Sequence, residues 1–574
     1  MKKILLFLVL LLNAAATFAS KTFTKDGVTY TYSRNTASVT STASGLAHIT
    51  ILESITPSDG ITYSVTSIGD YAFSGSDLTS VTIPSSVTSI GTEAFQGSGL
   101  TSVTIPSSVT SIGAGAFAKC ADLTSIDVES GNQNFSSKDG VLFSKDEKTI
   151  VCYPAGYIGN SYAIPSTVTS IGEAAFSGCT KLTSITIPPS VTSIGAGAFG
   201  GSVFMSVTIP SSVSSIGAYA FSSSQLSSII FAEGSKLTSI EPNTFEQCQY
   251  LASITIPSSV TSIGEYAFAD CSGLKSAPFA EGAELNDIGS YAFSGCSGLT
   301  SVTIPSSVTS IMEGAFRGCS ALATVYLPKK TAAAELGEYA FDDTYSDIKF
   351  CVEDGTGTYD LTIYTGATNW TSYASKIFYY CPKTISPAGI GTLYLPYEVT
   401  IPTGVTAYKF DATDNKTYVT LKQIPEETTT ISAGTPVYLT ATAGTTYNFY
   451  ATSNDINETN NNGFVKGTKE DIAYVADTYL TLGQITGGTT YGFYMYSNSE
   501  SPIKANTCYI KKADIPATAK GFTLSFDGGT TAIDAATATA EPAMKVYYDL
   551  QGRRVLNPTK GLYIVNGKKV VINQ

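Results

Sequence analysis

The chain has little of what most catalytic and metal-binding sites are made of. Its 574 residues include one histidine, His48, one tryptophan, and only 14% charged residues. A Ser-His-Asp or Cys-His arrangement would have to use His48. The ten cysteines are scattered singly, so neither histidine nor cysteine spacing indicates a zinc site. An acidic chain of formal charge −13 also lacks the basic surface that nucleic acids require. We therefore expect no catalytic residues, no cofactor, no metal and no nucleic-acid partner.

The first 19 residues have the pattern of a secretory signal peptide. Lys2 and Lys3 precede an apolar run from Ile4 to Leu12, and small residues from Ala14 to Ala19 suit cleavage after Ala19. The apolar run is shorter than the roughly 20 residues that span a bilayer. We predict a signal peptide at 1–19, no transmembrane segment, and an exported protein that is extracellular or held at the cell surface.

One sequence unit is repeated from Val65 to Phe341. A representative copy reads SVTSIGTEAF at 86–95 and continues to Pro106. Its last phenylalanine recurs at intervals of 22 to 25 residues, with one interval of 59. This period is the length of a leucine-rich-repeat coil, and such short units bury a core only by stacking. The sequence predicts a mainly β solenoid of about 11–12 coils with a parallel sheet. The repeated phenylalanines are Phe73, Phe95, Phe117, Phe176, Phe199, Phe221, Phe245, Phe268, Phe293, Phe316 and Phe341.

Each unit contains a short strand with one apolar and one hydroxyl face. In 299–305, Val302 and Ile304 share one face, and Ser301 and Thr303 share the other. The hydroxyl columns are interrupted by Asp127, Ile230, Pro278 and Tyr326. Either the hydroxyls simply suit a solvated strand, or they form a flat recognition surface. The candidate binding residues are Ser80, Thr82, Ser102, Thr104, Ser184, Thr186, Ser206, Thr208, Ser253, Thr255, Ser301, Thr303 and Tyr326.

Two further positions of the unit carry restricted residue types. The third residue after ten of the eleven phenylalanines is serine or cysteine, which predicts a slot of limited volume holding buried free thiols; disulfides between adjacent coils are the alternative. The glycine after the unit's isoleucine predicts a preference for positive φ, although Glu241 and Met312 replace it in two coils. The residues assigned a structural role are Phe95, Phe117, Phe176, Phe199, Phe268, Phe293, Cys120, Cys179, Cys248, Cys271, Cys296 and Cys319.

The unit SVTSIGxxAFxxCxxLTSITIP closely resembles the BspA-type leucine-rich repeat of surface and secreted proteins from Bacteroides-like bacteria. The resemblance covers roughly 280 of the 574 residues. It implies the solenoid fold and, from the best-known members of the family, adhesion or host-matrix binding. The ligand is not implied.

The 59-residue interval contains an insertion at about 129–164. Alternating apolar runs at 134–143 and 148–154, separated by Ser144 to Glu147, predict a β-hairpin. Similar hairpins recur within the family that the repeat resembles. The hairpin is therefore either a structural elaboration or a protruding recognition element.

The flanking segments define the remaining predicted domains. Residues 20–63 are expected to cap the array at 64–343, with His48 as a surface or structurally satisfied residue. Residues 344–384 would close the other end, with Cys351 and Cys381 as a candidate disulfide. Short alternating runs over 385–535 predict an antiparallel, sandwich-like β domain. It resembles accessory modules of exported Bacteroides and Prevotella proteins.

The last segment, 541–574, resembles a type IX secretion sorting domain. The resemblance rests on the stretches 546–555 and 560–570 and implies attachment at the outer membrane. This segment is locally basic, whereas residues 64–343 contain 10 Lys/Arg and 23 Asp/Glu and so carry the whole net charge. The acidic array favours solubility and could also attract cationic partners.

These features together predict a binding protein without enzymatic activity. The first hypothesis is an adhesin-like surface or secreted protein whose solenoid contacts proteins or host matrix. The alternative is a glycan-capture or structural cell-envelope protein, with contacts made by the C-terminal β domain.

Overall fold

The computed structural model describes residues 21–330, 332–353, 360–387, 389–395, 397–413 and 418–452, and nine short strands between 466 and 572. The predicted signal peptide lies outside these residues. The chain is mainly β and forms two units. The first unit contains 1–352 and 360–377, and the second contains 353–359 and 378–574.

The first unit begins with an antiparallel meander. Strands β1 (Lys21–Lys25), β2 (Val28–Ser33) and β3 (Thr36–Thr42) pair in order, and β3 then pairs in parallel with β6 (Tyr63–Ile68). A short strand, β5 (Ser54–Ile55), pairs antiparallel with β6. Val28, Tyr30 and Val39 of the meander are buried in the core that continues into the coils. The meander therefore covers the apolar end of the stack.

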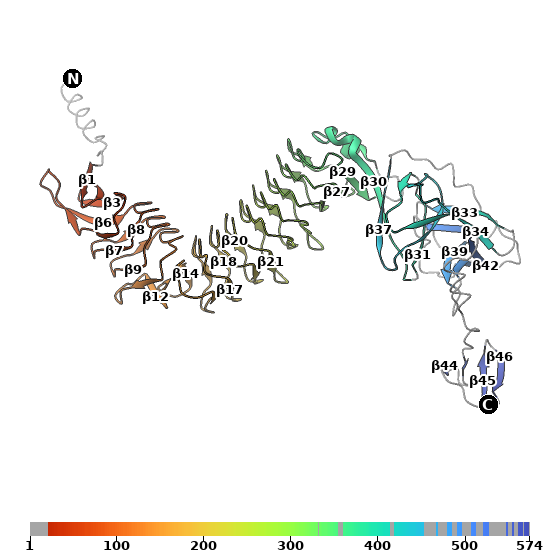
Figure 1. The fold of residues 1–574 in the computed structure, drawn as a ribbon, viewed down its shortest axis with the longest axis horizontal. Coiled ribbons are helices and arrows are strands. Elements are labelled where there is room, and N and C mark those ends of the chain that lie inside the picture. The colour runs from red at the N-terminus through yellow and green to blue at the C-terminus, as the bar shows by residue number, and fades with distance from the viewer. Residues whose placement is uncertain are drawn as a thin grey trace, which may run out of the picture. The chain divides into compact units, whose positions relative to one another are not determined.

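Stacked coils follow, and each contributes a strand to one or both of two parallel ladders (Figure 1). The first ladder contains β4 (His48–Thr50), β7 (Ser80–Thr82), β9 (Ser102–Ile105), β11 (Ser125–Val128), β15 (Ser161–Ala163), β17 (Ser184–Thr186), β19 (Ser206–Ile209), β21 (Ser228–Phe231), β25 (Ser301–Thr303), β27 (Thr324–Leu327) and β29 (Lys349–Glu353). The second contains β6, β8 (Ser89–Ile90), β10 (Ser111–Ile112), β14 (Thr149–Cys152), β16 (Ser170–Ile171), β18 (Ser193–Ile194), β20 (Ser215–Ile216), β22 (Ser239–Ile240), β23 (Ser262–Ile263), β24 (Asp287–Ile288), β26 (Ser310–Ile311) and β28 (Glu335–Leu336).

The two-residue period of a strand explains the first ladder. In β9, Val103 and Ile105 are buried, whereas Ser102 and Thr104 are exposed. In-register pairing such as Ser102 with Ser125 and Val103 with Ile126 places like residues above one another. Apolar side chains therefore line the core, and hydroxyls form columns on the outside, as the sequence predicts.

A tight turn, which we call the corner, follows each second-ladder strand and carries the repeated Ala-Phe pair inward. The phenylalanine rings of successive coils stack with centroids 5.0–5.5 Å apart, as in Phe73–Phe95 and Phe221–Phe245. All eleven phenylalanines are at most 2% exposed. The ring column therefore forms the centre of the hydrophobic core.

The glycine after the isoleucine does not have positive φ, contrary to the sequence prediction. It is needed because the coils approach closely there: a Cβ on Gly91 would lie 2.5 Å from the backbone nitrogen of Asp70. Positive φ occurs two residues later, at the position before Ala-Phe, with values of 52–62°. This position is occupied by Tyr71, Glu93, Gly115, Ala174, Gly197, Tyr219, Asn243, Tyr266, Tyr291, Gly314 and Tyr339.

The 59-residue interval contains one more coil, whose aromatic residue is a tyrosine. Strands β12 (Phe135–Lys138), β13 (Val141–Ser144) and β14 pair antiparallel in succession, and β14 then joins β16 in the second ladder. The Tyr153 ring stacks on Phe176 at 5.1 Å. Only two residues separate Ile150 from Tyr153, against four between Ile112 and Phe117. This coil therefore has a shortened corner.

Because of the shortened corner, the corners on either side meet directly. The Lys119 backbone N–H donates to the carbonyl oxygen of Ser177 at 3.1 Å, although the two residues belong to coils on opposite sides of Tyr153. The array changes direction near β12 and β14 (Figure 1). The insertion therefore alters the path of the solenoid.

An aromatic cluster closes the C-terminal end of the array. It follows a short helix, α2 (Thr362–Thr365), and lies at the start of the 3-10 helix η1 (Trp370–Lys376). Trp370 is 1% exposed, and its ring contacts Phe341 and Phe350 at 6.3 and 5.7 Å. Its Nε1–H donates to the Ala334 carbonyl oxygen at 2.9 Å. The only tryptophan in the sequence thus covers the last ring of the column.

The second unit contains a β domain with one nine-stranded sheet and shorter strand pairs. Its packing as a sandwich stays a prediction. Apart from the parallel pair β34–β42, the strand pairs that join these elements are antiparallel. A β-bridge between Val399 and Ala451 links the pairs β30–β37 and β32–β35. These strands are β30 (Ile377–Thr384), β37 (Thr446–Tyr450), β32 (Val399–Thr400) and β35 (Thr430–Ile431). The nine-stranded sheet runs β31 (Ile390–Leu393), β36 (Val437–Thr440), β33 (Thr406–Thr413), β34 (Tyr418–Gln423), β42 (Gly521–Phe526), β40 (Tyr491–Met495), β39 (Tyr479–Gln484), β41 (Thr507–Lys511) and β38 (Lys466–Thr468).

The last described strands form a separate four-stranded sheet in the order β44-β43-β45-β46. They are β43 (Tyr547–Tyr548), β44 (Arg554–Val555), β45 (Gly561–Val565) and β46 (Lys568–Ile572). The sorting role suggested by the sequence of this segment stays a prediction.

Candidate functional site

The outer face of the first ladder contains all thirteen candidate binding residues. Twelve are the serines and threonines of the hydroxyl columns, which point away from the core. Ser301 and Tyr326 are half-buried, whereas the other eleven are exposed. The structure therefore brings residues up to about 250 positions apart in sequence onto one face of the stacked coils, where their strands pair in several short sheets.

His48 lies on this face, at the head of the serine column. It is exposed in β4, which pairs with β7 so that His48 stands opposite Ser80. Its Nδ1 lies 2.7 Å from the Ser80 hydroxyl oxygen. The first ladder therefore starts within the segment that the sequence assigns to the cap, and His48 takes a place that serine holds in later coils.

Two of the four interruptions of the hydroxyl columns, Ile230 and Pro278, line hollows in the face. Ile230 is 58% exposed and lines a groove of about 410 Å³ together with Glu233 and Thr255. Pro278 lines a second groove of about 400 Å³, which also includes Thr303. Ala280 lines both grooves, so the two adjoin.

Tyr326 extends the apolar part of the same surface. It pairs with Thr303 across β25 and β27 and so stands beside the second groove. Asp127, the fourth interruption, lies in β11, which precedes the insertion, and it lines neither groove. The outer face thus has a hydroxyl-rich surface with one apolar, hollowed region over residues 229–326.

The six cysteines of the restricted slot are buried free thiols, as the first interpretation predicts. Each Sγ lies in hydrogen-bond range of the carbonyl oxygen of the aromatic residue in the preceding coil, for example Cys271 to Phe245 at 3.1 Å. The slot therefore selects a small side chain, and its cysteines add a hydrogen bond to the preceding coil. This bond is not a requirement of the slot, because the hydroxyl of the slot serine Ser202 is buried without a hydrogen-bond partner among the described residues.

Burial weakens the acidity of three of the slot thiols. It raises the pKa of Cys120, Cys179 and Cys296 above the ordinary thiol value, because the thiolate would be desolvated. Reactive cysteines need the opposite shift. These three cysteines therefore do not resemble nucleophiles, whereas hydrogen bonding, chiefly with Cys271, lowers the pKa of Cys248.

Cys351 in β29 and Cys381 in β30 are both buried. Burial raises the pKa of Cys351 to about 12. Their pairing as a disulfide stays a prediction.

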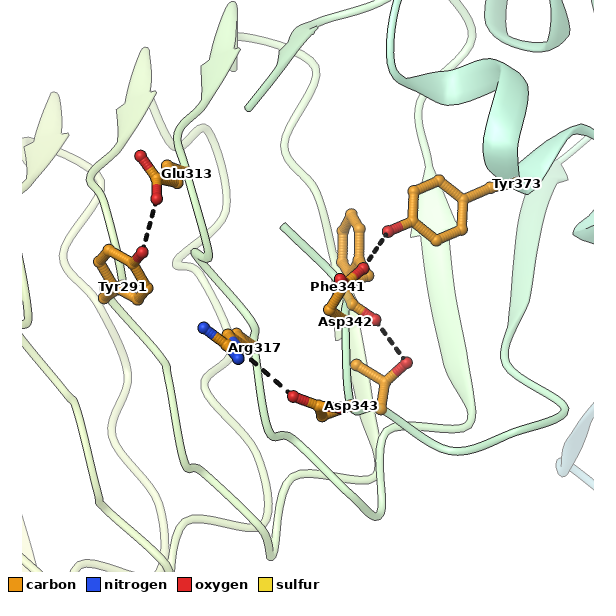
Figure 2. A network of polar contacts seen from close by, with 8 residues as sticks. Tyr291, Glu313, Arg317, Phe341, Asp342, Asp343 and Tyr373 are labelled. Carbon is orange, nitrogen blue, oxygen red and sulfur yellow. Dashed lines mark hydrogen bonds and ion pairs between the residues drawn. The ribbon is translucent and has the colours of Figure 1, made fainter. Parts of the chain in front are cut away.

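The corners carry a set of polar contacts that the sequence analysis did not single out. The Tyr291 hydroxyl donates to the Glu313 carboxylate at 2.6 Å, and Arg317 Nε lies 3.3 Å from Asp343 on the next coil (Figure 2). The hydrogen bond to Glu313 raises the pKa of the Tyr291 phenol. The signal available in the sequence is the tyrosine two residues before the phenylalanine in five of the coils.

Within the part of the chain that the structure describes, no group of three or more His, Cys, Asp and Glu side chains is arranged to hold a metal ion. No helix among these residues is long and apolar enough to cross a membrane.

The repeat can now be assigned to a family. The model of the BspA-type leucine-rich-repeat region matches residues 48–144, 158–275 and 238–371, which is more than half of the chain. The chain belongs to the BspA-type leucine-rich-repeat family. A comparison with curated proteins finds no match.

Several solved structures are similar to the chain. A leucine-rich-repeat protein from Eubacterium ventriosum is 22% identical, with 57% of this chain and 95% of that chain covered and a TM-score of 0.43. A leucine-rich cell surface protein from Faecalibacterium prausnitzii is 28% identical, with 59% and 95% covered and a TM-score of 0.35. The pneumococcal vaccine antigen PcpA is 18% identical, with 57% and 99% covered and a TM-score of 0.35.

Proposed function

We propose that the chain is an exported binding protein without enzymatic activity, and that it contacts a macromolecular partner through the outer face of the first ladder. The partner is a protein, with host matrix as the setting that the repeat family suggests. The signal-peptide pattern at 1–19 supports export, and display at the cell surface or release from the cell would both bring this face to the partner.

The observation that carries the proposal is the apolar, hollowed region over residues 229–326. A solvated strand face favours hydroxyl side chains. Ile230 stands at such a position, and its apolar side chain is 58% exposed. Pro278 and Tyr326 depart from the column in the same region, and the two adjoining grooves are lined by residues 229–306. Exposed apolar surface gathered beside grooves is typical of protein-binding sites.

The test replaces Ile230 and Tyr326, which interrupt the hydroxyl columns, with threonine, the residue that the equivalent position holds in most coils. The double variant Ile230→Thr/Tyr326→Thr keeps the strand propensity and removes the apolar contacts. We expect its affinity for immobilised matrix proteins to fall about tenfold, the effect of losing one or two central apolar anchors. The readout is surface plasmon resonance with the secreted full-length chain.

The matched control is Thr88→Ser/Thr110→Ser, which changes two exposed threonines outside the first ladder and should leave the affinity unchanged. Equal affinity of the Ile230→Thr/Tyr326→Thr variant and the parent chain would contradict the proposal. Binding to a glycan array that survives this variant would favour the alternative, in which the second unit captures glycans.

A further inference from the structure

A second surface, on the corners, also has the form of a binding site. A groove of about 560 Å³ extends from the corner at 92–96 to the corner at 219–223. It lies where the shortened coil of Tyr153 lets neighbouring corners meet, so that Lys119 bonds to Ser177. This face differs from the outer strand face on which the proposed function rests, since none of the residues lining this groove belongs to the first ladder.

The groove exists because small residues occupy the positive-φ position of three successive corners. Gly115, Ala174 and Gly197 form its floor, whereas Glu93 and Tyr219 hold the equivalent position at its two ends. The small floor residues allow another polypeptide backbone to approach closely. The larger side chains at the ends would bracket a bound segment.

Two carboxylates, the lysine Lys119 and an aromatic ring line the groove, so its lining has a net charge of −1. Glu173 is exposed, Glu93 is half-buried, and neither carboxylate makes a hydrogen bond or an ion pair within the described part of the chain. Tyr219 is 50% exposed. Carboxylates and aromatic faces both attract ammonium and guanidinium groups.

The charge of the array is concentrated on the same face. Each corner lies within a seven-residue segment centred on a repeated phenylalanine, such as 70–76 around Phe73. Together the eleven segments contain ten of the array's 23 carboxylates and only two cations, Lys119 and Arg317, so they supply −8 of the array's net charge of −13. The carboxylates are Asp70, Glu93, Glu173, Glu246, Glu265, Asp270, Glu313, Glu338, Asp342 and Asp343.

Tyrosines are spaced along this acidic face at a backbone position that disfavours them. Five coils place tyrosine where φ is 54–60°, a region that bulky side chains rarely adopt. Tyr71 and Tyr339 are more than half exposed, and Tyr266 stacks on Tyr291 at 5.1 Å. The corner face therefore combines aromatic surface with a net negative charge of −8.

We propose that the corner face binds an extended, lysine- or arginine-rich segment of a partner protein, with the groove between Glu93 and Tyr219 as its central seat. The carboxylates select the positive charge, Tyr219 contacts a cationic side chain through its ring, and the glycine and alanine floor accommodates the peptide backbone. Charge complementarity favours this partner over an acidic or neutral glycan.

The experiment measures binding of a short fluorescein-labelled peptide of alternating lysine and glycine to the full-length chain by fluorescence anisotropy. We expect Glu93→Gln/Glu173→Gln to weaken binding about five- to tenfold, as the loss of two exposed charge contacts allows. Tyr219→Asn should weaken it about two- to fivefold through loss of the cation–π contact. Asparagine already holds the equivalent positive-φ position at Asn243, so this variant is expected to fold.

The matched control is Asp127→Asn/Glu281→Gln, which removes the same charge from residues that do not line the groove. Less than a twofold change in this control is expected. An equal loss in both double variants would overturn the proposal, because the attraction would then be non-specific. Binding of a neutral oligosaccharide that requires Tyr219, without peptide binding, would also overturn it. We expect Ile230→Thr/Tyr326→Thr to leave peptide binding unchanged. This result would show that the corner face binds independently of the outer face of the first ladder, on which the proposed function rests.

Discussion

Single residues in this solenoid are selected by contacts between coils rather than by contacts within one coil. Gly91 is small because the backbone of Asp70 lies against it, and Cys271 is a donor because the Phe245 carbonyl oxygen faces it. Each such contact recurs once per coil. A residue preference that is repeated in the sequence therefore indicates a contact with the adjacent coil, about 22–25 positions away.

Replacing Cys271 separates the volume of its slot from the hydrogen bond that its thiol donates. Cys271→Ser keeps a small donor and should retain the stability of the parent chain to within about 1 kcal/mol. Cys271→Ala has nearly the same volume as the serine variant but lacks the donor, while the Phe245 carbonyl oxygen still accepts from the Cys248 N–H at 3.1 Å, so it should be less stable than the serine variant by about 0.5–1.5 kcal/mol. Urea unfolding followed by circular dichroism measures both variants. Equal stability of the two would show that volume alone governs the slot.

At the scale of one element, the coil of Tyr153 shows how the array accommodates an irregular unit. Its three strands β12–β14 replace part of the standard coil, and its tyrosine continues the aromatic column beside Phe176. The Tyr153 hydroxyl is buried without a hydrogen-bond partner among the described residues. Burial also raises the pKa of this phenol well above that of an exposed tyrosine.

Tyr153→Phe should therefore stabilise the chain by about 1 kcal/mol, because a desolvated hydroxyl is removed while the ring remains. Tyr153→Ala should instead cost about 3–5 kcal/mol through the cavity it leaves. Thermal unfolding monitored by calorimetry compares the two with the parent.

Alkaline pH gives the Tyr153→Phe variant a second readout. The unfolded state ionises this tyrosine near pH 10, whereas the folded state keeps it protonated. Its contribution to stability is therefore complete below pH 10 and declines as the pH rises further. The variant should lose less stability than the parent above pH 10, and parallel losses would contradict the assigned burial.

For the first unit as a whole, stability depends on closing both ends of the stack. A solenoid exposes apolar edges wherever a coil lacks a neighbour, and here the β1–β3 meander and the Trp370 cluster cover those edges. Coupling between coils passes through nearest neighbours, so damage at one end should spread only over adjacent coils.

Trp370→Ala should destabilise the C-terminal coils by about 3–5 kcal/mol, since a large buried ring and its bond to Ala334 are lost. Hydrogen–deuterium exchange should accelerate over 301–352 and remain unchanged over 80–128. Uniform acceleration along the array would show that the solenoid unfolds as one cooperative unit instead.

The sequence by itself determined the solenoid, the inward and outward strand faces and the buried thiols. Each of these features follows from a pattern that is present within one repeat unit and recurs in the next. Phe95 and Thr104 can be placed from their own unit alone. The sequence analysis also proposed the outer face as a binding surface, which stays a prediction.

Only the tertiary structure decided where different coils come together. It showed that Tyr153 continues the phenylalanine column, that the glycine after isoleucine serves close approach, and that His48 heads the serine column. It also showed the groove between Glu93 and Tyr219, which depends on the meeting of two corners 58 residues apart at Lys119 and Ser177. The physical reason is that a local pattern fixes the direction of a side chain, whereas the shape of a surface depends on how neighbouring coils stack.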